Sequence, residues 1–458
     1  MSYDNDRLGA ALKLYLGSNP LPMHMPGHKR NPALITSEFY QDITEIQGFD
    51  NLHSPNGLLK DLESAAAVLW KAAGAFISVG GSTAMILSAI AACNAVNPGS
   101  RVLVAMNCHL SVWHALELTG NEIIPLMPVT DPALPFAGPV NSADIASVLL
   151  RDPLIRTVII TSPTYEGVIS DTEEIYRITR KYDATLIVDC AHGSHLGLDD
   201  TFWGEDVCGD IVIKSLHKTL NAPTQTALML TYEACRVPEE VLRHYIDIFE
   251  TSSPSYILLK GVSHAIASIN SDSSLMNGWE SGIVTAEQRL AGLKNYRFWQ
   301  APVRERSKLV LLGDGIALAD RLHSDFNIEC EAAFATHLIA MTGIGDTVQS
   351  LERFTDAVRR IDDISDVQSE TKTVARPRPV FGMNIRDAAR SGLTADSGRL
   401  DECAGRICGE YLFCYPPGVP LLVPGEVITQ DVIDYVGQSG SQILKGSALF
   451  DGCLKVLT

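Results

Sequence analysis

The sequence predicts an α/β fold with a doubly wound, mainly parallel sheet. Four short runs are apolar on both faces, which is typical of buried parallel strands; they cover residues 101–105, 157–161, 184–188 and 210–213. Between the second and third runs, Asp171 begins a segment with a capping-box start and helical apolar spacing. Strand, helix and strand therefore follow one another, and units of this kind in series place ligands at the carboxyl ends of the strands.

Length and charge narrow the class of protein. The chain has 458 residues, which at about 150 residues per domain predicts two to three domains. Its formal net charge of -18 disfavours nucleic acid and anionic lipid as partners. No apolar run of about 18 residues and no signal-like start occurs, so we expect a cytoplasmic protein that is not inserted in a membrane. The ten cysteines contain no C-x-x-C pair, and we expect free thiols and no metal site.

The chain divides into an arm and two larger parts. Residues 1–35 carry four prolines and resemble an arm that packs on another surface. Residues 36–300 contain the strand and helix units of a large domain. Near residue 300 the pattern changes to short strands, such as 335–341, and a long helix after Asp346. We therefore predict a smaller C-terminal α+β domain over residues 301–458.

Three sequence features at strand or helix ends are typical of an active site. Lys218 follows the strand at 210–213, in the run Ser215-Leu216-His217-Lys218. Asp189 ends the strand at 184–188, where a buried carboxylate is costly unless it pairs with a cation. The run Gly80-Gly81-Ser82-Thr83 precedes a helix, whose amides and dipole can bind a phosphate.

These features together fit pyridoxal phosphate. A lone lysine at a strand end is usually an ordinary surface residue, but this cofactor needs a lysine for a Schiff base, an aspartate beside its ring nitrogen and a helix N-terminus for its phosphate. The order and spacing of Lys218, Asp189 and the glycine turn are those of an aspartate aminotransferase-like large domain.

Motifs over nearly the whole chain resemble one family, the short form of the Orn/Lys/Arg decarboxylases, which are fold type I pyridoxal phosphate enzymes. The matching motifs are 25–29 (MPGHK), 42–45 (DITE), 81–83 (GST), 107–109 (NCH), 162–165 (SPTY), 189–195, 215–220 (SLHKTL), 252–256 (SSPSY), 415–420 (YPPGVP) and 424–426 (PGE). Each motif alone is weak, but their common order is specific.

The resemblance implies roles for individual residues. Lys218 is similar to the Schiff-base lysine, Asp189 to the partner of the ring nitrogen, and His109 to the residue stacked on the cofactor ring. Phosphate ligands are then expected at Ser82, Thr83 and Ser215, with His192 and His217 on the reacting face. In the family the active site lies between two subunits, which implies a homodimer. His192 and His195 have the spacing of two metal ligands but lack a third nearby.

The implied reaction is α-decarboxylation of arginine, lysine or ornithine through the Lys218 Schiff base. An acidic side chain must then receive the distal guanidinium or ammonium group, and Glu45 and Glu426 are candidates. Nothing in the sequence selects among the three substrates, because pocket geometry decides between them.

Departures from the family pattern leave a second reaction open. Leu110, Glu166, Cys190 and Lys260-Gly261 stand where other residues are usual. The alternative is elimination or cyclisation on a modified basic amino acid whose carboxylate is retained. That carboxylate would need a cation, and Arg376, Arg378 and Arg386 are candidates. A catalytically silent homologue is disfavoured, because it would have no use for Lys218, Asp189 and His109 together.

Overall fold

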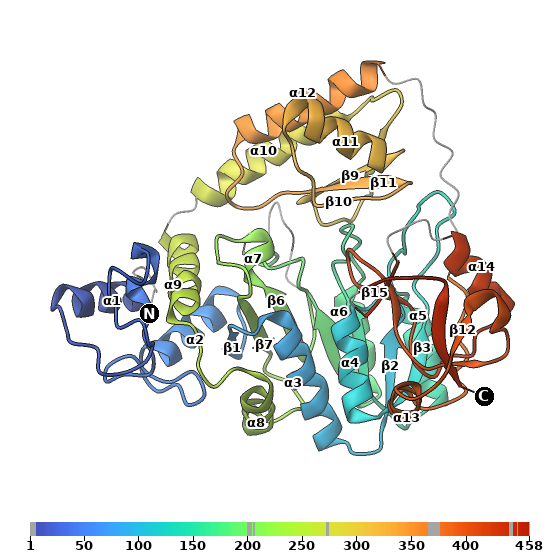
Figure 1. Cartoon of the computed structure of the whole chain (residues 1–458), viewed down its shortest axis with the longest axis horizontal. Coiled ribbons are helices and arrows are strands. Elements are labelled where there is room, and N and C mark those ends of the chain that lie inside the picture. The colour runs from blue at the N-terminus through green and yellow to red at the C-terminus, as the bar shows by residue number, and fades with distance from the viewer. Residues whose placement is uncertain are drawn as a thin grey trace.

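The computed structural model describes residues 6–198, 204, 207–271, 274–364, 376–438, 443–446 and 448–457. A seven-stranded sheet in the order β1-β7-β6-β5-β4-β2-β3 forms the centre of the large domain (Figure 1). Only β7 runs antiparallel to its neighbours in this sheet, which confirms the predicted fold class. The strands are β1 (Gly74–Ser78), β2 (Arg101–Ala105), β3 (Glu122–Leu126), β4 (Ile155–Thr161), β5 (Thr185–Asp189), β6 (Ile211–Ser215) and β7 (Ala227–Thr231).

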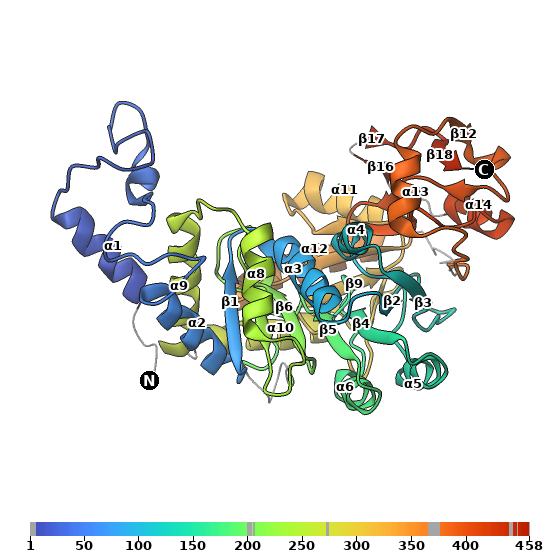
Figure 2. The same ribbon diagram turned by 90° about the horizontal axis from the view of Figure 1, so that it is seen from below.

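Helices cover both faces of this sheet. In Figure 2, α3, α4 and α8 lie on one face, and α5 and α6 lie on the other. The predicted helix start is present, since Asp171 accepts a hydrogen bond from the amide of Glu174 at the beginning of α6. The helices of this domain are α2 (Leu58–Leu69), α3 (Gly81–Val96), α4 (Leu110–Thr119), α5 (Ser142–Arg151), α6 (Thr172–Lys181), α7 (Leu216–Thr219), α8 (Glu239–Phe249) and α9 (Tyr256–Ser271).

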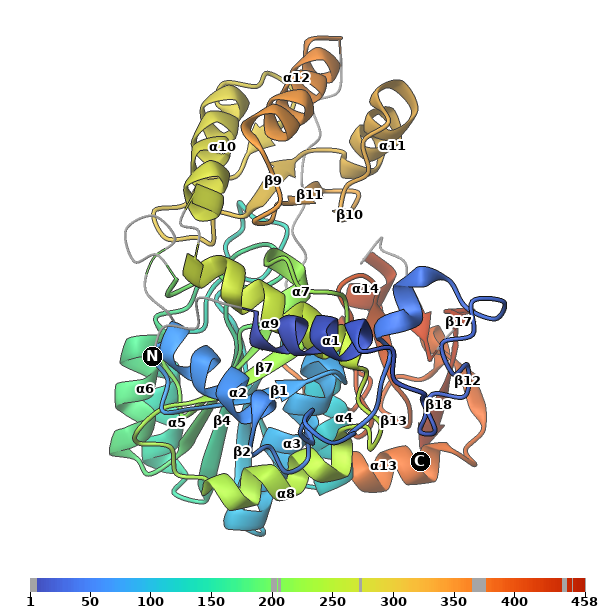
Figure 3. The ribbon, with the colours of Figure 1, turned by 90° about the vertical axis from the view of Figure 1, so that its left-hand side faces the viewer.

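The N-terminal segment is partly docked and partly exposed. Helix α1 (Arg7–Gly17) buries Leu8 and Leu12 and lies against α9 (Figure 3). Beyond it, the chain runs through a short 3-10 helix (Ser37–Gln41) and projects from the body of the molecule (Figure 2). Its exposed large apolar side chains are Leu21, Met23, Met25, Leu34 and Phe39.

A second domain stands above the large one in Figure 1. Its four-stranded sheet has the order β10-β11-β9-β8. The boundary expected near residue 300 falls between β8 and β9, and these strands belong to one sheet because their backbones pair in antiparallel register. The domain therefore begins before that position. Its elements are α10 (Ser274–Leu290), β8 (Arg297–Phe298), β9 (Lys308–Leu312), α11 (Gly315–Phe326), β10 (Ala332–Ala333), β11 (His337–Met341) and α12 (Val348–Ile364).

The rest of the chain forms a third, C-terminal unit, so residues 301–458 contribute to two units. This unit has its own apolar core and two small antiparallel sheets. Its elements are α13 (Ile385–Gly392), β12 (Ser397–Arg399), a 3-10 turn (Leu400–Glu402), β13 (Ile407–Cys408), β14 (Leu412–Cys414), β15 (Val419–Leu422), α14 (Gln430–Gln438), β16 (Ile443–Lys445), β17 (Ala448–Leu449) and β18 (Cys453–Leu457). Across the described ranges, every helix is too short or too polar to cross a bilayer.

Candidate active site

A cavity of about 840 Å³ lies at the carboxyl ends of the parallel strands. Strand register places these ends together, because Thr161 pairs with Asp189 and Asp189 pairs with Ile213. The structure brings all eight residues expected to bind the cofactor to the wall of this cavity: Ser82, Thr83, His109, Asp189, His192, Ser215, His217 and Lys218.

Lys218, His192 and Asp189 form the centre of the site. The Nζ atom of Lys218, on α7, lies 2.9 Å from Nε2 of His192, which follows β5. Burial lowers the pKa of Lys218, while the charge of Asp189 opposes that change. Burial raises the pKa of Asp189, and the charge of Lys218 opposes this rise. A lysine whose pKa is lowered by burial, next to a buried carboxylate, suits a nucleophilic lysine.

The three histidines of the site are held as neutral rings. Burial, followed by the charge of Lys218, lowers the pKa of His192 well below its ordinary value. The same two causes lower the pKa of His109 to about 4, and burial lowers that of His217. His217 Nδ1 lies 3.0 Å from the carbonyl oxygen of Thr226, so its proton is on Nδ1 and its Nε2 can accept a hydrogen bond. A neutral imidazole can donate one hydrogen bond and accept another.

The start of α3 provides the anion site. Gly81, with a φ of 75°, turns the chain into the helix in a conformation that favours glycine. Among the described residues no side-chain hydrogen bond caps this helix, and its first residues, Gly81, Ser82 and Thr83, line the cavity, so its first amides are available to an anion. The hydroxyl groups of Ser82 and Ser215 lie 2.6 Å apart. These hydroxyls and amides converge where a phosphate would be bound.

Two buried polar atoms on the cavity wall fit a bound group. Within the described residues, neither Asn107 Oδ1 nor His192 Nδ1 has a hydrogen-bond partner. Asp189 is 3% exposed and accepts a hydrogen bond from the amide of Ala191, but no cation of the described residues forms an ion pair with it. A buried carboxylate in this state is costly, and a protonated pyridine nitrogen would compensate it. The residues therefore fit pyridoxal phosphate.

Of the residues expected to bind the substrate, Arg376 lies on the cavity wall, and Glu45, Glu426, Arg378 and Arg386 do not. Glu45 is in the N-terminal segment, where it accepts a hydrogen bond from Thr44, and Glu426 is buried in an ion pair with Arg376 at 2.9 Å. Arg386, on α13, donates to the carbonyl groups at the end of α4, a position that suits a cation at a helix C-terminus. Arg378 is exposed away from the cavity wall, whereas Arg376 lies on it and also donates to the carbonyl of Met106.

Two other carboxylates line the cavity. Glu166 follows β4, accepts a hydrogen bond from Thr164 at 2.9 Å and has a pKa raised by burial. Glu331 comes from the second domain, where it accepts a hydrogen bond from the Tyr165 hydroxyl at 2.9 Å. Glu166 is visible in the sequence as a departure from the family pattern, but Glu331 lies in no motif.

Most of the chain matches proteins of one known family. Residues 8–310 match the Orn/Lys/Arg decarboxylase major domain, and residues 368–443 match the C-terminal domain of that family. The chain is 26% identical to an arginine decarboxylase of Bacillus subtilis, over 95% of this chain and 94% of that protein. It is also similar to an inducible lysine decarboxylase of Escherichia coli, with 22% identity over 90% of this chain and 73% of that protein.

Solved structures show the same architecture. The constitutive lysine decarboxylase of E. coli superposes with a TM-score of 0.79 at 19% identity, covering 99% of this chain and 82% of that one. The Sphingomonas wittichii serine palmitoyltransferase superposes with a TM-score of 0.56 at 14% identity, covering 79% of this chain and 87% of that one. The chain therefore belongs to the Orn/Lys/Arg decarboxylase family, a family of pyridoxal phosphate-dependent amino acid lyases with the fold type I architecture.

Proposed function

We propose that the chain removes the α-carboxyl group of a basic amino acid, with pyridoxal phosphate held by Lys218. The observation that carries this proposal is the position of Lys218, Asp189 and His192 in one cavity next to the amides of α3. When bound, the cofactor supplies a sink for the electron pair that remains after CO2 leaves.

The residues of this chain have separate tasks in that reaction. Asp189 would keep the ring nitrogen protonated, since its buried carboxylate favours a cationic neighbour. His192 Nε2, 2.9 Å from Lys218 Nζ, would accept a hydrogen bond from the lysine amine and orient it. His109 would lie against the ring from the start of α4, where its Nδ1 is fixed by the Ser111 hydroxyl at 2.8 Å. Ser82, Thr83 and Ser215 would hold the phosphate.

The acidic side of the cavity supports a basic substrate. Glu166 and Glu331 approach it from different domains, and a guanidinium or ammonium group binds carboxylates through charge-assisted hydrogen bonds. We propose these two residues, in place of Glu45 and Glu426, as the receptors of the distal cation of arginine, lysine or ornithine. The net charge of -18 would also favour the approach of a cation.

We further propose that the protein is a homodimer. The support is the projecting N-terminal segment, on which Leu21 and Met23 are each 82% exposed. Apolar side chains at this density are typical of a surface that is covered by a partner, and a second copy of the chain is the partner that the family suggests.

Mass spectrometry of the products tests the reaction. The purified holoenzyme is incubated separately with arginine, lysine and ornithine, and the loss of CO2 from one of them is the expected result. The alternative with a retained carboxylate has Arg376 as its support, because this guanidinium reaches the cavity. Because Glu426 already balances the charge of Arg376, this arginine is not available to a substrate carboxylate, and we favour decarboxylation. Failure with all three substrates, together with turnover of a hydroxylated arginine that keeps its carboxylate, would contradict our proposal.

A further inference from the structure

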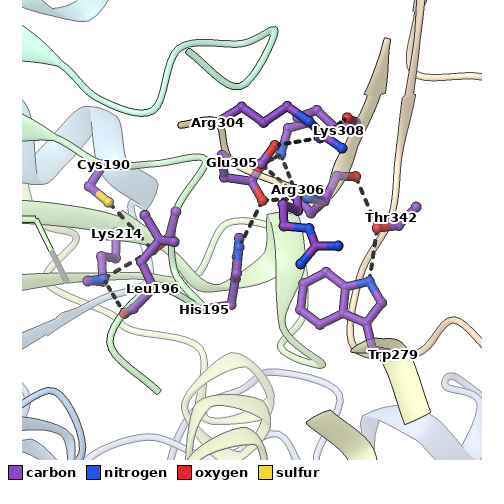
Figure 4. Close-up of polar contacts among 12 residues, drawn as sticks. Cys190, His195, Leu196, Lys214, Trp279, Arg304, Glu305, Arg306, Lys308 and Thr342 are labelled. Atoms are coloured by element: carbon purple, nitrogen blue, oxygen red, sulfur yellow. Dashed lines mark hydrogen bonds and ion pairs between the residues drawn. The ribbon is translucent and has the colours of Figure 1, made fainter. Parts of the chain in front are cut away.

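A segment of the second domain reaches the turn that carries the catalytic residues. We call residues 304–308 the anchor segment and residues 189–196 the catalytic turn. Nε2 of His195, at the end of the catalytic turn, lies 2.9 Å from Oε1 of Glu305, and neither side chain is accessible to solvent. Figure 4 shows the His195 ring pointing from the large domain toward the Glu305 carboxylate.

The Glu305 carboxylate is held by four groups. Oε1 also accepts a hydrogen bond from the amide of Ser307 at 2.6 Å, while Oε2 accepts from the Ser307 hydroxyl at 2.6 Å and from Lys308 Nζ at 3.1 Å. These contacts use the full accepting capacity of a carboxylate, and Lys308 balances its charge. Although burial raises the pKa of Glu305, Lys308 and His195 outweigh it and keep the carboxylate ionised.

His195 acts here as a neutral donor. Burial lowers its pKa, although the Glu305 charge opposes this, and the nearby charges of Lys308 and Lys214 lower it further. The ring is therefore neutral near pH 7, and its Nε2 contacts the Glu305 carboxylate at 2.9 Å.

The catalytic turn is also tied to the large domain. Lys214 Nζ donates to the carbonyl groups of Gly193 and Leu196 at 3.1 and 3.2 Å, and the Ser194 hydroxyl donates to the carbonyl of Ser215 at 2.6 Å. A Cβ atom on Gly193 would come within 2.7 Å of Cys190 and Pro163. The turn therefore has little freedom, and His192 lies in its middle.

The anchor segment holds a second cavity loop as well. The amide of Glu305 donates to the carbonyl of Gly167 at 2.8 Å, and Gly167 directly follows Glu166 on the cavity wall. On its other side, Arg304 and Arg306 pair with Glu287 of α10 at 2.5 Å each. The anchor segment thus joins two cavity loops of the large domain to the frame of the second domain.

We propose that Glu305 is a positioning residue: by holding His195 it fixes the catalytic turn and so aligns Asp189 and His192 with Lys218. The kinetic part of this inference rests on the proposed function. A purely structural role is the alternative, because removing one partner of a buried ion pair destabilises a protein wherever the pair lies.

The test compares Glu305→Gln with a matched control, Glu287→Gln. The control breaks the ion pairs of Arg304 and Arg306 in the same domain but leaves the His195 contact in place. In cofactor-free protein we measure amide hydrogen exchange over 189–196. In holoenzyme we measure kcat, KM and the pH dependence of the cofactor absorbance.

For Glu305→Gln we expect exchange in the catalytic turn to be about tenfold faster or more. Its kcat should fall by about tenfold or more with KM nearly unchanged, and Glu305→Asp should recover part of both losses. In Glu287→Gln the exchange rate of the catalytic turn and kcat should stay near the wild-type values, even if the melting temperature of this variant falls.

Equal changes in the two variants, or a change in melting temperature alone, would overturn the proposal. If Glu305→Gln does not fold, His195→Gln replaces it, because this variant keeps a donor for Glu305, and His195→Leu, which lacks one, supplies the contrast. If the wild type decarboxylates no basic amino acid, the proposed function fails. Hydrogen exchange and the cofactor absorbance would still test the positioning role of Glu305, so the two failures can be told apart.

Discussion

The amine nitrogen of Lys218 lies 2.9 Å from Nε2 of His192. Burial lowers the pKa of both groups, because a positive charge is costly in this site. The fully buried Asp189 favours a cation in the same space. A third group that brings a positive charge would compensate this carboxylate, and the protonated pyridine nitrogen of pyridoxal phosphate would be such a group.

Replacement of Lys218 by alanine should abolish turnover and the covalent link to the cofactor. Without Nζ, the cavity can still bind the phosphate through α3, but borohydride has no imine bond to reduce. The measurement is peptide mass spectrometry after borohydride treatment, with Lys181→Ala on the exposed end of α6 as control. A labelled peptide in Lys218→Ala, or full activity of this variant, would refute the assignment.

Asp189→Asn should retain the cofactor but lose turnover by orders of magnitude. Asparagine preserves the shape of the side chain, while the ring nitrogen loses the carboxylate that keeps it protonated. Cofactor content measured by absorbance and kcat measured by CO2 release separate the two effects. Near-normal kcat would show that another group protonates the ring.

The residues named from the sequence as cofactor ligands all line one cavity, whereas the border of the second domain lies before the expected position. Lys218 and Asp189 were recognisable because each follows a strand with an unbroken apolar run, and parallel register then brings these ends together. The border of the second domain was not recognisable, since β8 has only two residues, Arg297 and Phe298, and produces no alternating pattern. Its position depends on pairing with β9, which is a tertiary contact.

The carboxylates on the cavity wall were the least predictable part of the site. Glu331 precedes the two-residue strand β10 and reaches the cavity because the second domain stands over the large one. Glu426 stands in a family motif, yet it is buried against Arg376. Charge and motif alone do not show which face of a loop a carboxylate occupies.

Glu331→Gln should lower kcat/KM for the basic substrate by about 10- to 100-fold, mainly through KM. The amide keeps the contact with Tyr165 but lacks the charge that pairs with the distal cation, and a lost charged hydrogen bond has about this effect. Glu166→Gln should act in the same direction. Glu329→Gln is the control, because Glu329 is exposed and lies off the cavity wall. Equal KM values for all three variants would exclude Glu331 and Glu166 as the receptors of the distal cation.

Charges placed on the N-terminal segment should break the proposed homodimer. We expect Met23→Asp and Leu34→Asp to shift the protein from dimer toward monomer in sedimentation velocity, because each replaces an exposed apolar side chain that a partner would cover. Leu150→Asp on α5 is the control, since Leu150 is similarly exposed but lies on the large domain. A dimer of undiminished strength in both arm variants would argue that another surface joins the subunits.

The pKa of His109 predicts how stability changes with pH in cofactor-free protein. Its value is lowered from 6.5 to about 4 in the folded state. Above pH 6.5 the ring is neutral in both states and has no effect. Between pH 6.5 and 4 the unfolded chain binds a proton that the folded site refuses, so the free energy of unfolding falls as the pH falls.

From pH 7.5 to 5 this loss should amount to about 2 kcal/mol for His109 alone. The His109→Gln variant cannot titrate at this position, so its free energy of unfolding, measured with urea, should decrease by about 2 kcal/mol less than that of the wild type over the same range. His264→Gln, at an exposed position on α9, should follow the wild type. An identical decrease in the wild type and His109→Gln would mean that His109 accepts a proton in the folded state as readily as in the unfolded chain, and that it is not held as the neutral ring that a cofactor-stacking role requires.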